Sequence, residues 1–236
     1  MLDFTGQAVI VTGATGNVGS AVALRLARLG ATLVLAGTRQ KELHELGARI
    51  GGAPHLLIAG ADTRTHEGAT RIAAEAIAAF GRIDALVNTV GTFKTANVVD
   101  GASRDWSAIM DLNALSALLL CEAVLPHMRE RGYGRIVNVS AAAGTRAFTG
   151  ASVYAASKAA VLRITEAVSE ENKAVGVTAN CILPGTIDTP QNRAAMPQVD
   201  HALWVGAEDI AAAVAFLASR DAGGITGAAI PITGKQ

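Results

Sequence analysis

Short runs of apolar and β-branched residues alternate with longer, alanine-rich segments along the whole chain. Most of the short runs are continuously apolar, which is typical of parallel strands that are covered on both faces. Strands are predicted at residues 8–12, 32–36, 55–58, 85–88, 135–140, 177–183 and 229–232.

The longer segments between these strands have the spacing of apolar residues expected for helices. Helices are predicted at residues 18–29, 40–50, 67–80, 103–131, 151–173 and 208–219. A glycine follows five of them, where a helix end favours a left-handed residue: Gly30, Gly51, Gly81, Gly132 and Gly176. Strands separated by helices predict an α/β fold with a doubly wound, seven-stranded parallel sheet and helices on both faces.

The pattern continues without a linker, a repeat or a low-complexity tract, so residues 1–236 are predicted to form a single domain. Residues 186–206 are the least regular stretch and contain Pro190 and Pro197. We interpret this stretch as a short substrate lid near the carboxyl edge of the sheet.

Composition narrows the possible partners. Half of the 236 residues are hydrophobic and 17% are charged, which is enough for a sizeable core. Twenty basic and twenty acidic residues give a net charge of zero, which argues against nucleic acid or an anionic membrane as a partner. Cys121 and Cys181 lie far apart in apolar surroundings, so neither a disulfide framework nor a metal site is expected.

The N-terminus leads directly into an apolar strand and lacks the pattern of a signal peptide. The most apolar run within the predicted helices, residues 114–125, contains Glu122 and stops at Pro126, so it is too short to span a bilayer. The chain is therefore predicted to be a soluble protein of the cytoplasm.

A glycine-rich turn joins the first strand to the first helix. Glycines let the backbone turn sharply and let a pyrophosphate approach the free N–H groups at the helix start. The competing interpretation is a turn that only packs a strand on a helix. The turn residues predicted to bind a nucleotide are Gly13, Thr15, Gly16, Asn17, Val18 and Gly19.

The end of the second strand indicates which dinucleotide is bound. The sequence Ala-Gly-Thr-Arg at residues 36–39 has no acid to hold the adenosine ribose, whereas Thr38 and Arg39 can hold a 2′-phosphate. NADP(H) is therefore favoured over NAD(H), unless Arg39 is simply a solvated residue at a helix start. Asp62 is expected beside the adenine, with capping of the next helix as the alternative.

Tyr154 and Lys158 are four residues apart on a predicted helix, so they share one face. A nearby ammonium favours tyrosinate and is expected to lower the pKa of Tyr154 below its ordinary value of about 10. The pair can then exchange a proton with a substrate oxygen near neutral pH.

These motifs resemble the short-chain dehydrogenase/reductase family over essentially the whole chain. The resemblance is carried by the turn at residues 12–19, Asn-Thr-Val-Gly at 88–91, Asn113, Tyr154 with Lys158, and Pro-Gly through Thr at 184–189. It implies a Rossmann-type sheet and an NAD(P)(H)-dependent oxidoreductase that transfers a hydride between nicotinamide and a small carbonyl or alcohol substrate. It also implies a homodimer or homotetramer.

The resemblance also implies roles for individual residues. Tyr154 would be the acid/base, Lys158 would bind the nicotinamide ribose and lower the tyrosine pKa, and Asn113 would hold a water of the proton relay. The remaining residues implied at the cofactor are Asn88, Gly91, Pro184, Gly185, Ile187 and Thr189.

The sequence departs from the family pattern at three places. The glycines of the turn are spaced by threes, and the usual Asn-Asn-Ala-Gly is Asn-Thr-Val-Gly. Family members usually have a serine thirteen residues before the tyrosine, where this chain has Ala141. Ser140 is its neighbour and would point to the opposite face unless the strand end bulges. Loss of such a donor commonly costs about two to three orders of magnitude in rate.

Two alternative functions follow from this departure. Ala141 and the loop from Asp188 to Trp204 resemble quinonoid dihydropteridine reductase-like members, whose pterin or quinonoid ring accepts hydride readily. A catalytically idle nucleotide-binding oligomer is the other alternative, although an idle protein has no chemical need for Tyr154, Lys158 and Asn113 together. The helices at 103–131 and 151–173 are apolar on more than one face, which favours assembly through them.

Overall fold

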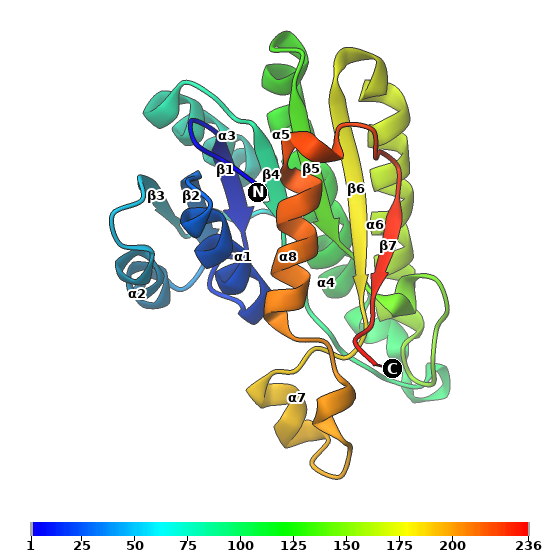
Figure 1. Ribbon diagram of the computed structural model, residues 1–236. Coiled ribbons are helices and arrows are strands. Elements are labelled where there is room, and N and C mark those ends of the chain that lie inside the picture. The colour runs from blue at the N-terminus through cyan, green and yellow to red at the C-terminus, as the bar shows by residue number, and fades with distance from the viewer. Residues whose placement is uncertain (1, 236) are drawn as a thin grey trace.

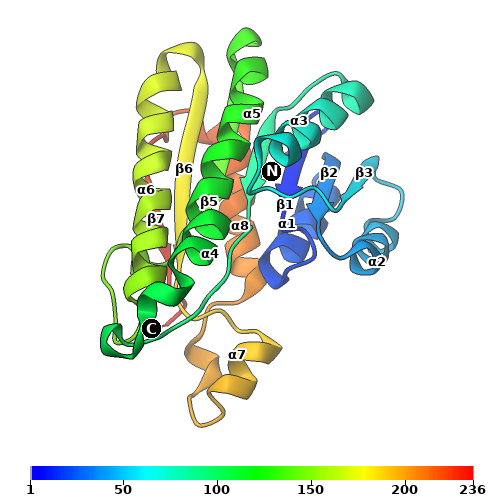
Figure 2. The same cartoon turned by 180° about the vertical axis from the view of Figure 1, so that it is seen from behind.

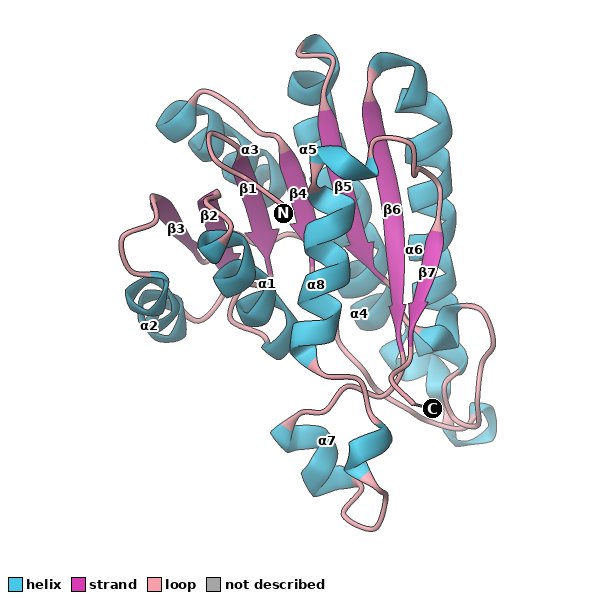
Figure 3. Cartoon of the chain, viewed as in Figure 1, coloured by secondary structure: helices cyan, strands magenta, loops and turns pink. Residues whose placement is uncertain are grey.

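The computed structural model describes residues 2–235, and within them seven strands form one parallel sheet. The order across the sheet is β3-β2-β1-β4-β5-β6-β7 (Figures 1 and 3). The predicted fold class is therefore confirmed, with strand ends displaced by one residue at most. The strands are β1 (Ala8–Thr12), β2 (Thr32–Gly37), β3 (His55–Ala59), β4 (Ala85–Asn88), β5 (Gly134–Val139), β6 (Val177–Pro184) and β7 (Ala229–Ile232).

Helices cover both faces of the sheet, as Figures 1 and 2 show from opposite sides. One face carries α1 (Asn17–Arg28), α2 (Gln40–Ile50) and α8 (Ala207–Ala218). The other face carries α3 (His66–Phe80), α5 (Ser116–Glu130) and α6 (Ser152–Asn172). Two shorter helices, α4 (Trp106–Met110) and α7 (Pro190–Ala195), lie toward the carboxyl ends of the strands.

The sheet separates two hydrophobic cores, and successive residues of a strand enter different cores. On β1, Val9 and Val11 pack in the core under α1 and α8, while Ile10 packs in the core under α3 and α5. On β2, Leu33 and Val34 divide in the same way. Because both faces are buried, most positions of a central strand carry an apolar residue, which explains the continuous apolar runs of the sequence.

The helix predicted at residues 103–131 is interrupted. A 3-10 turn (Ala102–Asp105) and α4 lead into a π-helical segment (Asp111–Leu115), and only then does α5 begin. Such π segments are rare and occur often at functional sites. As the predicted range implies, α5 continues through Pro126 and ends at Glu130. Pro126 is exposed, so water can reach the carbonyl that its ring leaves without a donor.

The same segment, Ala102–Glu130, is long and apolar enough by length and composition to cross a membrane, because a window of 18 residues within it has a mean hydropathy of 1.8. Half of that 18-residue window is buried inside the protein, against the sheet and the neighbouring helices. A core helix of a globular fold meets the same criteria, so the segment gives little support to a membrane span.

The five glycines predicted to end helices all have positive φ angles. The tightest of them is Gly176, where a Cβ would lie 2.3 Å from the carbonyl oxygen of Gly132. Only glycine fits such a turn without displacing backbone.

Residues 186–206, predicted as a lid, form α7 and a 3-10 turn (His201–Leu203) beyond the carboxyl ends of the strands (Figure 1). The base of the segment is closed by a β-bridge between Ile187 and Val205. The segment therefore leaves and rejoins the body of the protein at one point. Its action as a substrate lid stays a prediction.

Candidate active site

The glycine-rich turn brings backbone very close to backbone at the start of α1. Gly13 has a φ of +65°, and a Cβ on Gly19 would lie 2.3 Å from the Gly13 carbonyl oxygen. Gly19 therefore has the packing role that was the competing interpretation. The N-cap residue is Gly16, which has no side chain to bond the first N–H groups, and the first turn contains no acid. An uncapped helix start of this kind fits the phosphates of a dinucleotide.

Arg39 connects the end of β2 to this turn. Its guanidinium Nη2 donates to the carbonyl oxygen of Thr15 at 2.7 Å, and its Nη1 lies 3.4 Å from a carboxylate oxygen of Glu42. Gly37 and Thr38 complete the strand end without an acid, and Thr38 is exposed. Arg39 is thus both a half-exposed helix-start residue and a cation placed at the glycine-rich turn.

Asp62 lies after β3, and its carboxylate pairs with Arg64 at 2.8 and 2.9 Å. These hydrogen bonds lower the pKa of Asp62 to about 2, so the group is ionised at neutral pH. The alternative role as a helix cap is wrong, because Thr65 caps α3 by accepting from the Gly68 N–H. The role at the adenine stays a prediction.

The end of β4 is tied to β1 and leads toward the predicted site residues. The buried Asn88 accepts from the Thr12 hydroxyl at 2.9 Å and from the Val90 N–H at 3.2 Å. Three residues on, a Cβ at Gly91 would lie 3.1 Å from both Asn113 Oδ1 and Lys158 Nζ. Gly91 therefore marks the point where these two predicted site residues come together.

Asn113 lies on the π-helical segment and is almost fully buried. Its amide Nδ2 donates to the Thr92 carbonyl oxygen at 3.0 Å and to the Ser157 hydroxyl at 2.9 Å, and its Oδ1 accepts from the Thr92 N–H at 2.7 Å. The side chain thus joins the loop after β4 to α6. The widened turn presents this amide to both partners. Its predicted role in holding a relay water stays a prediction.

Tyr154 and Lys158 lie one turn apart on α6, next to Asn113. Burial raises the pKa of Tyr154 to about 12 and lowers that of Lys158 to about 8. The expectation that the ammonium lowers the tyrosine pKa is therefore wrong for the cofactor-free protein. Lys158 Nζ donates instead to the carbonyl oxygen of Val139 at 2.9 Å, and desolvation dominates at the phenol.

Ser140 does not take the place of the missing serine. Its hydroxyl is buried and donates to the carbonyl oxygen of Lys158 at 2.7 Å, on the side of the strand end that faces α6. Ala141 is extended, with φ −163° and ψ 162°, and packs with Ala143, Ala155 and Tyr154. A methyl group therefore lies beside the tyrosine where the family usually has a hydroxyl.

The residues predicted after β6 reach the far side of the site. Pro184 ends β6, the Gly185 N–H donates to the Ile232 carbonyl oxygen at 3.0 Å, and Ile187 belongs to the bridge at the lid base. The Thr189 hydroxyl accepts from the Asn192 N–H at 3.1 Å and so caps α7. Contacts of these residues with carboxamide and phosphates stay predictions.

Two features of the site are missed by sequence reasoning. Asn17 of the turn donates to the side-chain oxygen of Gln191 on α7 at 3.2 Å, so the lid touches the glycine-rich turn. The rings of Phe93 and Tyr154 meet edge to face, with centroids 4.9 Å apart, and Phe148 lies 6.4 Å from Phe93. No sequence pattern predicts the contact of Phe93 with Tyr154, because the two residues lie far apart along the chain.

The turn, the uncapped helix start and the tyrosine–lysine pair define a nicotinamide-dinucleotide oxidoreductase. A model of the short chain dehydrogenase family matches residues 7–200. The chain belongs to this family, and it is an NAD(P)-dependent oxidoreductase.

Characterised relatives align over nearly the full chain. The chain is 31% identical to the 3-oxoacyl-(acyl-carrier-protein) reductase of Escherichia coli strain K12, covering 99% of this chain and 98% of the relative. It is 32% identical to the acetoacetyl-CoA reductase of Allochromatium vinosum, covering 95% and 96%. A crystal structure of levodione reductase is similar with a TM-score of 0.91 at 30% identity, covering 98% of this chain and 97% of that one.

The buried ammonium of Lys158 predicts a gain of stability when it is removed. Its pKa of about 8 in the folded protein lies below the ordinary value of about 10.4, so folding bears a cost at neutral pH. That cost declines between pH 8 and 10.5, as the lysine loses its proton in the folded state first. Lys158→Met should therefore raise the free energy of unfolding at pH 7 by about 1–3 kcal/mol.

Urea denaturation of the cofactor-free protein at pH 7 and at pH 9.5 measures this difference, which should shrink at the higher pH. Lys173→Met is the matched control, because Lys173 is half exposed and pairs only with Glu170 at the surface. If Lys158→Met lowered the free energy of unfolding by the same amount at both pH values, the prediction would be contradicted.

Proposed function

We propose that the protein transfers a hydride between NADP(H) and a small carbonyl or alcohol substrate, with Tyr154 as the acid/base. The observation that carries the proposal is the meeting of Lys158 Nζ and Asn113 Oδ1 at Gly91, with Tyr154 one turn from Lys158 on α6. Tyr154 and Lys158 come from α6, Asn113 from the π-helical segment and Gly91 from the loop after β4. A structural role alone does not require tyrosine, lysine and asparagine side chains to meet at one point.

The cofactor, when bound, supplies or accepts the hydride. The residues that would hold it are those of the glycine-rich turn at the phosphates and Lys158 at the nicotinamide ribose. Lys158 Nζ has one protein acceptor, the Val139 carbonyl, which leaves two of its three N–H bonds for ribose hydroxyls.

The protonation state of Tyr154 favours one direction of reaction. With a pKa of about 12 the phenol keeps its proton at neutral pH and can donate it to the oxygen of a carbonyl substrate. Oxidation of an alcohol needs the tyrosinate instead, so that direction should speed up with rising pH. The protonated phenol thus suits carbonyl reduction at neutral pH, which is the direction that the assays below measure.

Replacement of the tyrosine tests the proposal directly. Tyr154→Phe keeps the ring but removes the proton, and it should lower NADPH-dependent turnover by about 10²–10⁴-fold while NADPH still binds. The substrates to be screened are carbonyls, quinones and pterins, and the measurement is the loss of NADPH absorbance.

Tyr133→Phe is the matched control, because the other tyrosine of the chain bonds Gln7 and lies away from the site. Its turnover should stay within about twofold of the unsubstituted protein. Cofactor binding without turnover on any substrate class, and no effect of Tyr154→Phe, would favour the idle nucleotide-binding oligomer instead.

The preference for NADP(H) is the finer part of the proposal, and it is supported by Arg39 and by the absence of an acid after β2. A charge-assisted contact to a 2′-phosphate is worth about 1.5–3 kcal/mol, or roughly ten- to a hundredfold in affinity. The exposed pair with Glu42 is weak and does not prevent Arg39 from turning to the phosphate.

Arg39→Ala should therefore weaken NADPH binding about ten- to a hundredfold and leave NADH binding nearly unchanged. Glu42→Gln is the matched control, because it removes the competing carboxylate and should leave NADPH binding equal or tighter. Fluorescence titration of both reduced cofactors into the three proteins measures the effect. Tighter binding of NADH than of NADPH by the unsubstituted protein would refute the preference.

We also propose that the protein is a homodimer or homotetramer in the cytoplasm. On the two helices predicted to be apolar on more than one face, Leu119, Val161 and Leu162 are buried within the chain itself. Leu115 and Leu118, three positions apart, remain 37% and 36% exposed and support a contact with a second copy.

Light scattering at micromolar concentration should give two or four times the 24.0 kDa of one chain, and Leu118→Glu should reduce the mass. A 24.0 kDa particle for the unsubstituted protein would refute the assembly.

A further inference from the structure

Two large aromatic side chains near Tyr154 are exposed to solvent. Phe93 and Phe148 are 57% and 53% exposed, although the Phe93 ring contacts the Tyr154 ring edge to face. The centroids of the two phenylalanines are 6.4 Å apart with their planes tilted by 34°. We call these two rings the aromatic wall. Exposed aromatic rings in contact with a catalytic group suit a ligand that presents a flat apolar face.

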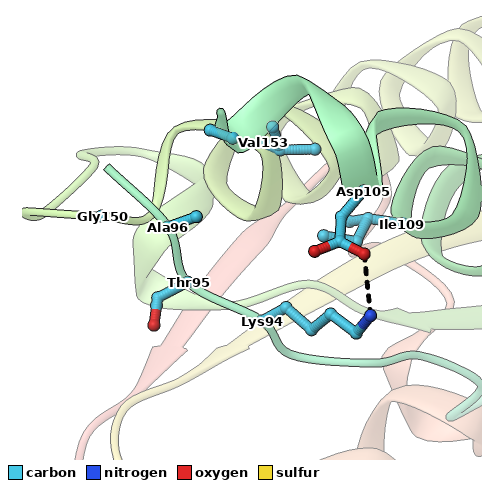
Figure 4. Close-up of a pocket in the computed structure, with 8 residues that line it drawn as sticks. Lys94, Thr95, Ala96, Asp105, Ile109, Gly150 and Val153 are labelled. Carbon is cyan, nitrogen blue, oxygen red and sulfur yellow. Dashed lines mark hydrogen bonds and ion pairs between the residues drawn. The ribbon is translucent and has the colours of Figure 1, made fainter. Parts of the chain in front are cut away.

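The loops that carry the aromatic wall are fixed by polar contacts on either side of the rings. Thr92, immediately before Phe93, exchanges two hydrogen bonds with Asn113. Lys94, immediately after it, forms an ion pair with Asp105 at 2.8 Å (Figure 4).

The second loop is joined to the first by the Ala96 N–H, which donates to the Gly150 carbonyl oxygen at 2.8 Å. The small pocket of Figure 4 lies between this joint and Val153, the residue before Tyr154. The wall is therefore a built surface and not a pair of loose side chains.

The second observation is that the aliphatic side chains packed with the tyrosine carry no hydrogen-bond donor. Ala141, Ala143 and Ala155 provide only methyl groups there. The Ser140 hydroxyl is bonded to the Lys158 carbonyl, and the Thr145 hydroxyl is bonded to the Ala142 carbonyl. Tyr154 is thus the donor that these residues leave for a substrate oxygen. A carbonyl that develops a localised negative charge needs more than one such donor.

Resting on the proposed function, we infer that the substrate is a planar ring whose carbonyl is conjugated with a second carbonyl, as in a cyclic dione or quinone. The ring would stack on the aromatic wall with its reacting oxygen at the Tyr154 hydroxyl. The neighbouring carbonyl makes the carbon electron-poor and, by withdrawing electrons through the σ bonds, stabilises the charge that forms on the oxygen, so one donor suffices. An open-chain 3-oxoacyl thioester has neither property.

The reaction balances with the components of the proposed function. A hydride, carrying two electrons, forms a C–H bond at the carbonyl carbon, and the nicotinamide is oxidised. The C=O π electrons move to the oxygen, which takes the proton from the Tyr154 hydroxyl. Solvent then returns a proton to the tyrosinate, and the product is a ring alcohol.

The first experiment compares three probes with NADPH: isatin, which is a planar ring dione, 2,3-butanedione, which is an open-chain dione, and acetoacetyl-CoA. Isatin should have a kcat/KM at least about tenfold above the other two. Phe93→Leu and Phe148→Leu should each raise the KM for isatin about tenfold, with a smaller change in kcat. The KM for 2,3-butanedione should stay nearly constant, because it presents no ring.

Phe216→Leu is the matched control, since Phe216 is 40% exposed on α8 and lies on the opposite face of the sheet. It should leave all three probes unchanged. Ala141→Ser restores the usual donor and should raise turnover of acetoacetyl-CoA at least tenfold, with little effect on isatin. Preference for acetoacetyl-CoA by the unsubstituted protein, or an unchanged KM for isatin in both phenylalanine variants, would overturn the inference.

A binding measurement separates this inference from the proposed function. Calorimetric titration of isatin into the protein with NADP⁺ reports stacking without turnover. Isatin binding that weakens in Phe93→Leu supports the aromatic wall even if no probe is reduced, in which case the proposed function alone fails. Isatin turnover abolished by Tyr154→Phe, together with unchanged binding in both phenylalanine variants, overturns the wall and leaves the proposed function standing.

Discussion

The side-chain amide of Asn113 holds together three parts of the chain that meet at the carboxyl end of the sheet. Its three hydrogen bonds fix the loop after β4 through Thr92 and fix α6 through Ser157, one residue before Lys158. If the buried amide of Asn113 lost these hydrogen bonds, each polar group left without a partner would cost about 1–3 kcal/mol in desolvation. The π-helical segment places Asn113 between the two partners. The hydrogen bonds of Asn113 therefore also position Gly91 and Phe93, which flank Thr92, and Lys158, which follows Ser157.

Local sequence patterns predicted the elements because each pattern had a local cause. The strands were recognised because residues such as Val9 and Ile10 are buried on opposite faces, which makes the run continuously apolar. The glycine-rich turn and the tyrosine–lysine pair were recognised because spacing alone brings their members together. The break before α5 was missed, because the demand that causes it comes from Thr92 and Ser157, which lie far from Asn113 in the sequence.

The same distinction explains what was missed in the site. The contact of Phe93 with Tyr154 joins the loop after β4 to α6, and neither segment has a sequence pattern that predicts it. The pKa of Tyr154 was expected to fall, because spacing suggested a nearby ammonium, whereas burial depends on everything packed around the ring. The direction in which Ser140 points was predicted correctly, since alternation along a strand is a local property.

The central place of β1 in the sheet has a consequence for how the chain folds. Val9 pairs with Leu33 on one side, but its partner on the other side is Ala85 of β4. The core on the α1 face needs α8 as well, so it lacks one of its walls until residues 207–218 are available. To form contacts between such distant segments the chain must close long loops, and the entropy lost in closing them slows folding. During synthesis, β1 and α1 therefore remain partly unburied until α8 has been made.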